Sequence, residues 1–149
     1  MKRINDVIRW LILPIILLIT GCATAPQLGT QGAPSAVPAE GSGRIVFYRP
    51  NGLFGYGMRA DILLDGQKVA RSAPGTKFYV DVPTGMHNVV VPNSLYSGER
   101  TLAITVRNRK VTYVRTSLGG SALGGRTNVE LIESSQGAAE AEGLELVNL

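Results

Sequence analysis

The chain has 149 residues, with 15 basic and 11 acidic side chains and a formal net charge of +4 at pH 7. Residues 1–21 hold three of the basic residues and one acidic residue, so the rest of the chain carries a net charge of only +2. This near-neutral balance argues against a nucleic-acid or polyanion binder. The single cysteine, Cys22, excludes an intramolecular disulfide.

The N-terminal segment has the features of a secretory signal. Basic residues near the start form an n-region, and an apolar stretch of secretory length follows at residues 10–19. A helix that spans a bilayer needs ~20 apolar residues. The stretch is about half that length and contains Pro14. We therefore expect residues 1–21 to be a signal peptide that is removed.

Cys22 follows the tripeptide Ile19-Thr20-Gly21, an aliphatic residue and then two small ones, which is the pattern of a bacterial lipobox. In that motif the thiol receives a diacylglyceryl group and the chain is cut just before the cysteine. The mature product would carry three acyl chains of the palmitate type and be permanently anchored. The alternative is an unmodified cysteine behind a signal cut elsewhere, but a free thiol is a liability in an oxidising compartment. Ala23, rather than aspartate, follows the cysteine, which favours the outer membrane by similarity to the Gram-negative sorting pattern.

The next segment, residues 22–42, is expected to be the lipidated cysteine and a disordered linker. It is rich in Ala, Pro, Gln, Gly, Ser and Thr, and Glu40 is its one charged residue. Such a composition cannot bury enough apolar surface to fold. Residues 43–149 then form one domain, which is large enough for a core without a metal or disulfide.

Hydrophobic residues in this domain alternate with a period of two, which predicts short strands. Strands are expected over residues 44–49, 60–65, 67–71, 77–82, 86–91, 102–106, 111–118 and 126–133. Asp65-Gly66 is a strong hairpin signal. We expect an exposed hairpin turn at residues 107–110 (RNRK) and a flexible glycine-rich loop at 119–125.

The C-terminal part is predicted to hold the one helix, at residues 134–142, ended by Gly143. A final edge strand is expected at 144–148. Seven or eight short strands at this spacing predict an all-β fold, a small antiparallel β-sandwich or open barrel.

Four segments resemble, in this order, the bacterial lipoprotein family known as domain of unknown function 2846. They are Gly43–Pro50 (GRIVFYRP), Leu63–Val69 (LLDGQKV), Phe78–His87 (FYVDVPTGMH) and Thr112–Arg115 (TYVR). The same order of strands and turns is similar to PEGA-type envelope domains. The resemblance implies an immunoglobulin-like or prealbumin-like sandwich in the cell envelope, and no assigned reaction.

Candidate catalytic residues are few. His87 is the sole histidine, and a triad would have to recruit Ser94 and Asp81, without any nucleophile-elbow motif. Paired carboxylates would have to come from Asp81, Glu99 or Glu130. No catalytic or metal-binding residues are therefore predicted, and no cofactor beyond the lipid on Cys22.

The loop at residues 51–59 is the candidate binding surface. It carries Leu53, Phe54, Tyr56 and Met58 among three glycines, and Tyr96 of a later loop could join them. These side chains either contact a partner or close one end of the sandwich. Replacing Phe54 with Ala would distinguish the two, since it should cost ~3–5 kcal/mol only if the ring fills the core.

We therefore expect a non-enzymatic outer-membrane lipoprotein whose domain faces the periplasm and binds an envelope protein or a glycan such as peptidoglycan. Two alternatives stay open. One is a periplasmic small-molecule binder or hydrolase with a cleft near His87, Asp81 and Tyr96. The other is a stress-induced structural module without a specific ligand.

Overall fold

The computed structural model describes residues 37–52, 57–92, 99–121 and 124–147. The strands and the helix of these residues are β1 (Ser42–Arg49), β2 (Ala60–Leu64), β3 (Gln67–Ser72), β4 (Thr76–Pro83), β5 (Gly85–Pro92), β6 (Glu99–Val106), β7 (Val111–Ser121), β8 (Gly124–Ile132), α2 (Ser134–Ala141) and β9 (Glu145–Leu146).

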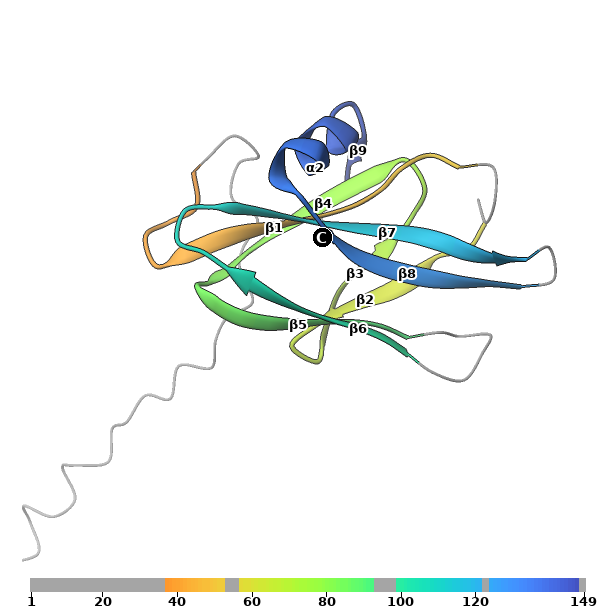
Figure 1. The fold of residues 1–149 in the computed structure, drawn as a ribbon, viewed down its shortest axis with the longest axis horizontal. Coiled ribbons are helices and arrows are strands. Elements are labelled where there is room, and N and C mark those ends of the chain that lie inside the picture. Colours follow the sequence, from red (N-terminus) through yellow and green to blue (C-terminus); the bar gives the residue numbers. More distant parts are fainter. Residues whose placement is uncertain (1–36, 53–56, 93–98, 122–123, 148–149) are drawn as a thin grey trace, which may run out of the picture.

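The strands form two sheets packed face to face, so the prediction of an all-β sandwich is confirmed (Figure 1). One sheet has the order β8-β7-β1-β4-β9 and the other the order β3-β2-β5-β6. Helix α2 lies on the outer face of the five-stranded sheet, away from the four-stranded one (Figure 1). Two neighbouring pairs, β1–β7 and β4–β9, are parallel, which adds parallel pairs to the expected antiparallel arrangement.

Strict alternation of side chains builds the core between the sheets. Phe78, Val80 and Val82 of β4 point inward, and the ring of Phe78 stacks on Phe47 of β1 at a centroid distance of 5.0 Å. The buried cluster consists of Ile45, Phe47, Ile62, Leu64, Phe78, Val80, Val82, Val89, Val91, Ile104, Val106 and Val114. The outward positions of β1, β4 and β7 are therefore free to build a site.

The turn between β2 and β3 confirms the hairpin signal. Asp65 and Gly66 have φ angles of 51° and 81°, both in the left-handed region that a two-residue hairpin of the I′ type requires. Aspartate tolerates this backbone conformation better than most residues, and glycine adopts it freely. The local sequence thus determines the shape of this turn.

The basic segment at residues 107–110 is an exposed turn, but the prediction that it closes a hairpin is wrong. It follows β6, which lies in the four-stranded sheet, and precedes β7, which lies in the five-stranded sheet. The chain therefore crosses between sheets here, and β7 pairs with β1 instead. Turn residues specify that a chain reverses, and they do not specify which strand it joins next.

The glycine-rich stretch is also different from the prediction. Residues 119–121 and 124–125 extend β7 and β8 as paired strands, with Gly119 opposite Arg126 and Gly120 opposite Gly125. Strand pairing uses backbone groups, so glycines can continue a ladder that the flanking residues have started.

Helix α2 begins and ends close to the predicted positions. The side chain of Glu133 caps it by accepting hydrogen bonds from the backbone N–H groups of Ser135 (2.9 Å) and Gln136 (3.2 Å). Gly143, at φ 74°, ends it. The strand that follows is shorter than predicted, because β9 pairs with β4 over only two residues.

Candidate functional site

A groove of about 510 Å³ lies between α2 and the outer face of the five-stranded sheet. Its apolar surface is made by Val46, Tyr79, Tyr113, Leu146 and the small residues Ala138, Ala139 and Ala141. Three charged residues, Arg44, Lys77 and Glu142, complete the lining. An apolar recess with a few convergent charges is the usual composition of a binding site.

Arg44 is fixed at the base of this groove. Its Nε and Nη2 atoms donate to Asp81 Oδ1 and Oδ2 at 2.6 and 2.8 Å, and its guanidinium carbon lies 4.3 Å from the centroid of the Tyr79 ring. The hydrogen bond with Asp81 raises the pKa of Arg44, although burial acts in the opposite direction. The pair is a part-buried, bidentate ion pair stacked on an aromatic ring. It positions Tyr79 as a rigid surface of the groove.

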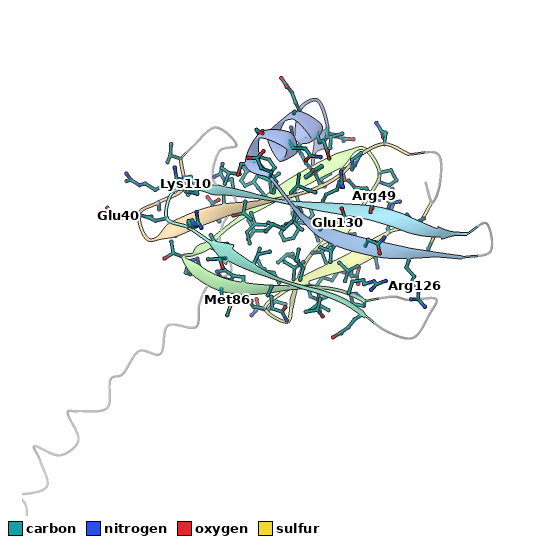
Figure 2. All side chains as sticks on the ribbon, in the orientation of Figure 1. Glu40, Arg49, Met86, Lys110, Arg126 and Glu130 are labelled. Carbon is teal, nitrogen blue, oxygen red and sulfur yellow. The ribbon has the colours of Figure 1, made fainter. Side chains whose placement is uncertain are left out.

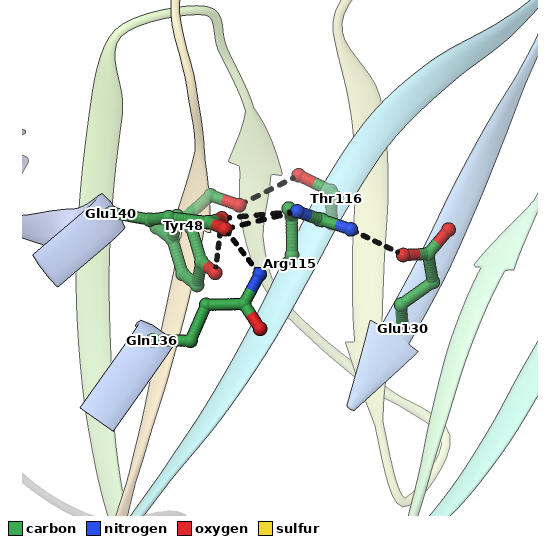
Figure 3. Close-up of polar contacts among 6 residues, drawn as sticks. All are labelled: Tyr48, Arg115, Thr116, Glu130, Gln136 and Glu140. Atoms are coloured by element: carbon green, nitrogen blue, oxygen red, sulfur yellow. Dashed lines mark hydrogen bonds and ion pairs between the residues drawn. The ribbon is translucent and has the colours of Figure 1, made fainter. Parts of the chain in front are cut away.

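Helix α2 is held over the groove by a polar cluster around Glu140 (Figure 3). Glu140 accepts hydrogen bonds from Tyr48 Oη at 2.8 Å, from Gln136 Nε2 at 2.7 Å and from Arg115 Nη1 at 3.1–3.2 Å. Arg115 also donates through Nη2 to Glu130 Oε2 at 2.8 Å. One arginine of β7 thus connects a carboxylate of the helix with a carboxylate of β8.

The pKa shifts in this cluster fit a structural role. Hydrogen bonds from Gln136 and Tyr48 lower the pKa of Glu140. Burial, and then the hydrogen bond to Glu140, raises the pKa of the Tyr48 phenol. A general acid needs a carboxyl whose pKa is raised, whereas Glu140 is held ionised. The cluster brings the candidate Glu130 close to a second carboxylate, that of Glu140. Arg115 binds both, so the pair holds the helix to the sheet.

The candidate catalytic residues His87 and Asp81 bind different partners and do not bind each other. His87 Nδ1 lies 2.7 Å from Asp65 Oδ2, and His87 Nε2 lies 2.8 Å from the carbonyl oxygen of Pro83. Both partners are acceptors, so each ring nitrogen of His87 faces an oxygen atom that belongs to the fold. Asp81 is bound by Arg44 instead. His87 therefore has no free nitrogen with which to accept a proton from a nucleophile.

Several predicted positions lie outside the described residues. These are the lipobox residues Ile19, Thr20, Gly21 and Cys22, the loop residues Leu53, Phe54 and Tyr56, and the residues Ser94 and Tyr96. Met58 is described and half-buried, and its carbonyl accepts a hydrogen bond from Arg49 Nη1 at 2.9 Å. Glu99 is exposed at the start of β6. The two interpretations of the loop at residues 51–59 thus both stay predictions.

Sequence reasoning missed the groove under α2, although one signal pointed to it. The period of two along β4 places Lys77, Tyr79 and Asp81 on its outward face, and the corresponding positions of β1 include Tyr48. Aromatic residues on the outward face of a sheet indicate that something covers this face. Here the cover is α2, whose position a local pattern cannot reveal.

The described ranges contain neither a cluster of metal-ligand side chains nor a membrane-spanning helix. Within them, no three or more histidine, cysteine, aspartate or glutamate side chains gather as they would around a metal ion. Among the same residues, no helix has the length and apolar character needed to cross a membrane.

Among known proteins, the chain is similar to a distant relative. An uncharacterized protein of Haemophilus influenzae is 23% identical over 130 residues, which amount to 85% of this chain and 76% of that protein. No family model matches the chain. No solved structure matches it either.

Proposed function

We propose that this chain is a lipid-anchored, non-enzymatic protein of the bacterial outer membrane, whose β-sandwich faces the periplasm and binds an envelope protein or a glycan. The observation that carries the proposal is Cys22 behind Ile19-Thr20-Gly21 at the end of a short apolar stretch. Lipid on this cysteine would fix where the domain acts and would remove a reactive thiol.

The groove under α2 supports the binding part of the proposal. Tyr79 and Tyr113 line it with aromatic rings, and Lys77 adds a positive charge, whereas the charge of Arg44 is already paired with Asp81. Lys77 Nζ donates to the carbonyl of Ala141 at 2.8 Å, so its charge too is held in place. Rigid aromatic surface next to pre-oriented charge suits a peptide segment or a sugar chain.

The alternative hydrolase near His87 has weaker support. Both nitrogens of this residue face acceptors that belong to the fold, and its expected partner Asp81 is paired with Arg44. If any hydrolytic activity is found, replacing His87 with Ala should leave its pH dependence unchanged. Loss of the activity in that variant would restore the alternative.

The anchor is tested by mass spectrometry of the mature N-terminus, together with membrane fractionation. We expect a chain that begins at an acylated Cys22 and sediments with the outer membrane. Cys22→Ser should abolish acylation, whereas Ala23→Asp should keep the lipid and move the protein to the inner membrane. A native product that is unacylated and water-soluble would contradict the proposal.

The groove is tested by filling it. Ala138 is exposed and lines the groove, so Ala138→Trp should block it while the sandwich stays folded. Ala103 is an exposed alanine of β6 in the other sheet, and Ala103→Trp is the matched control. After crosslinking in cells, recovery of partners should fall with the first variant only. Equal recovery of partners with both variants would exclude the groove as the binding site. If the native chain recovers no partner, a purely structural module is favoured.

A further inference from the structure

We propose that one end of the domain, the basic tip formed by Met86, Arg107, Arg109 and Lys110, docks on the anionic headgroups of the membrane that holds the anchor. The inference rests on the proposed lipid at Cys22 and deepens it, because it assigns the domain an orientation on the lipid surface.

The basic tip lies where the N-terminal segment enters the domain. The backbone N–H of Gly41 donates to the side chain of Asn108 at 2.9 Å, and the N–H of Arg109 donates to the carbonyl of Ser42 at 2.7 Å. The N–H of Thr84 donates to the carbonyl of Gly41 at 2.9 Å. The basic turn and the chain entry are thus one hydrogen-bonded unit.

Met86 adds an apolar group to the same end. It is 80% exposed, more than any other large hydrophobic residue that the structure describes. It lies opposite Thr105 in the β5–β6 pair, and its neighbour Gly85 lies opposite Val106, directly before the turn. Figure 2 shows Met86 and Lys110 at the end of the molecule that also bears Glu40. A flexible thioether beside cations suits insertion at the headgroup boundary.

The cations of the tip are available for an external partner. Arg107, Arg109 and Lys110 are all exposed, and none forms an ion pair with a described residue. The acidic groups at this end are mostly committed elsewhere. Among the described residues, Asp81 is bound by Arg44 and Asp65 by His87, whereas Glu40, which lies at the same end, forms no ion pair. The tip therefore presents an excess of positive charge.

Arg109 gives a second, independent indication. Its φ angle is 56°, in the left-handed region that glycine or asparagine adopts with less strain. The turn itself would form more easily with either of those residues. The presence of arginine in this strained conformation is explained if its side chain has a role of its own. Binding to an anionic surface would be such a role.

The position of the anchor makes this docking favourable. About twenty residues separate Cys22 from Gly41, and the composition of this segment predicts a disordered linker, for which the r.m.s. reach would be roughly 25 Å. The end of the domain that receives this segment is therefore held at a high effective concentration near the lipid. Each Lys or Arg near an anionic surface strengthens the attachment by roughly fivefold. The three basic residues of the tip would together strengthen it by about a hundredfold.

The experiment uses the acylated chain in vesicles, with a fluorophore whose emission shifts to the blue in an apolar environment. With Cys22 acylated, Thr105→Cys provides the one free thiol, on the exposed face of β6 opposite Met86. Thr101→Cys is the matched control on the same face of the same strand, about 13 Å farther along. Vesicles are made of phosphatidylcholine alone or with about 30% phosphatidylglycerol.

We expect a blue shift at position 105 in the anionic vesicles only, a smaller one at 101, and reversal near 1 M salt. Exchanging Arg107 for Gln, Arg109 for Asn and Lys110 for Gln together should abolish the shift, while the chain still floats with the vesicles through its lipid. An equal signal in both vesicle types, or a shift that survives the triple exchange at unchanged thermal stability, would overturn the docking alone. A native chain without lipid would contradict both the anchor and the docking.

Discussion

The phenol of Tyr48 on β1 donates a hydrogen bond of 2.8 Å to Glu140 on α2, a residue 92 positions later in the chain. With Arg115 on β7, it ties the helix to the outer face of the five-stranded sheet. The helix forms one wall of the candidate groove. Contacts that hold α2 in place therefore also determine whether the groove exists.

Removing the Tyr48 hydroxyl should loosen the helix. We expect Tyr48→Phe to lower the free energy of unfolding by about 1–1.5 kcal/mol, because a part-buried hydrogen bond to a carboxylate is lost while the ring stays packed. Urea unfolding followed by fluorescence measures the change. In a double-mutant cycle with Glu140→Gln, the two substitutions should be coupled by at least about 0.5 kcal/mol. Strictly additive effects would show that the two residues act independently.

Gly137 lets α2 approach the sheet. A Cβ atom placed there would lie 2.4 Å from both Cβ and Cγ of Tyr113. Alanine normally stabilises a helix relative to glycine by about 1 kcal/mol, but here we expect Gly137→Ala to destabilise the protein and lift the helix. Thermal unfolding and amide hydrogen exchange of residues 134–141 provide the measurement. The exposed Ala138→Gly is the control, and it should weaken the helix without increasing solvent access to Tyr113.

The sequence predicted the elements that depend on local rules. Alternation located the strands, Asp65-Gly66 marked the hairpin turn, and Gly143 marked the end of the helix. These features follow from side-chain direction and backbone preference, which neighbouring residues determine.

The arrangement of these elements could not be predicted in the same way. The turn at residues 107–110 has the composition of a hairpin, yet it leads from one sheet to the other. The pairing of β1 with β7, and the bond between Tyr48 and Glu140, join residues far apart in the chain. Such contacts depend on how whole sheets pack, and a single sequence carries no direct sign of them. The groove was missed for the same reason.

Asp65 should make stability depend on pH. Burial raises the pKa of its carboxyl, but the hydrogen bonds from the backbone of Asn88 and from His87 together outweigh burial and lower it. A carboxyl whose pKa is lower in the folded state stabilises the fold above its unfolded pKa of about 3.9, and this contribution is lost as the pH falls through the folded value.

We therefore compare the native chain with Asp65→Asn, because asparagine also tolerates the left-handed backbone. The native chain should be the more stable near pH 5.5, which lies above the unfolded pKa of the carboxyl. The side chain of Asp65 is 42% exposed, so the advantage should be at most about 1 kcal/mol. It should shrink towards pH 2.5, as urea unfolding at several pH values can measure. An advantage that stays constant across this range would contradict the role of the carboxylate.

A buried hydrogen bond inside the sandwich gives the last prediction. Ser72 Oγ of β3 and Thr116 Oγ1 of β7 lie 2.7 Å apart and join the two sheets, with the two residues 3% and 1% exposed. Thr116→Val keeps the shape but leaves the Ser72 hydroxyl without this partner, so it should cost about 1–3 kcal/mol in the free energy of unfolding. Adding Ser72→Ala removes the orphaned hydroxyl and should restore part of that loss, because two matched apolar groups are nearly neutral. Equilibrium unfolding of both single variants and the double variant tests this. If the double variant is as unstable as the two single losses combined, the hydroxyl pair does not stabilise the contact between the sheets.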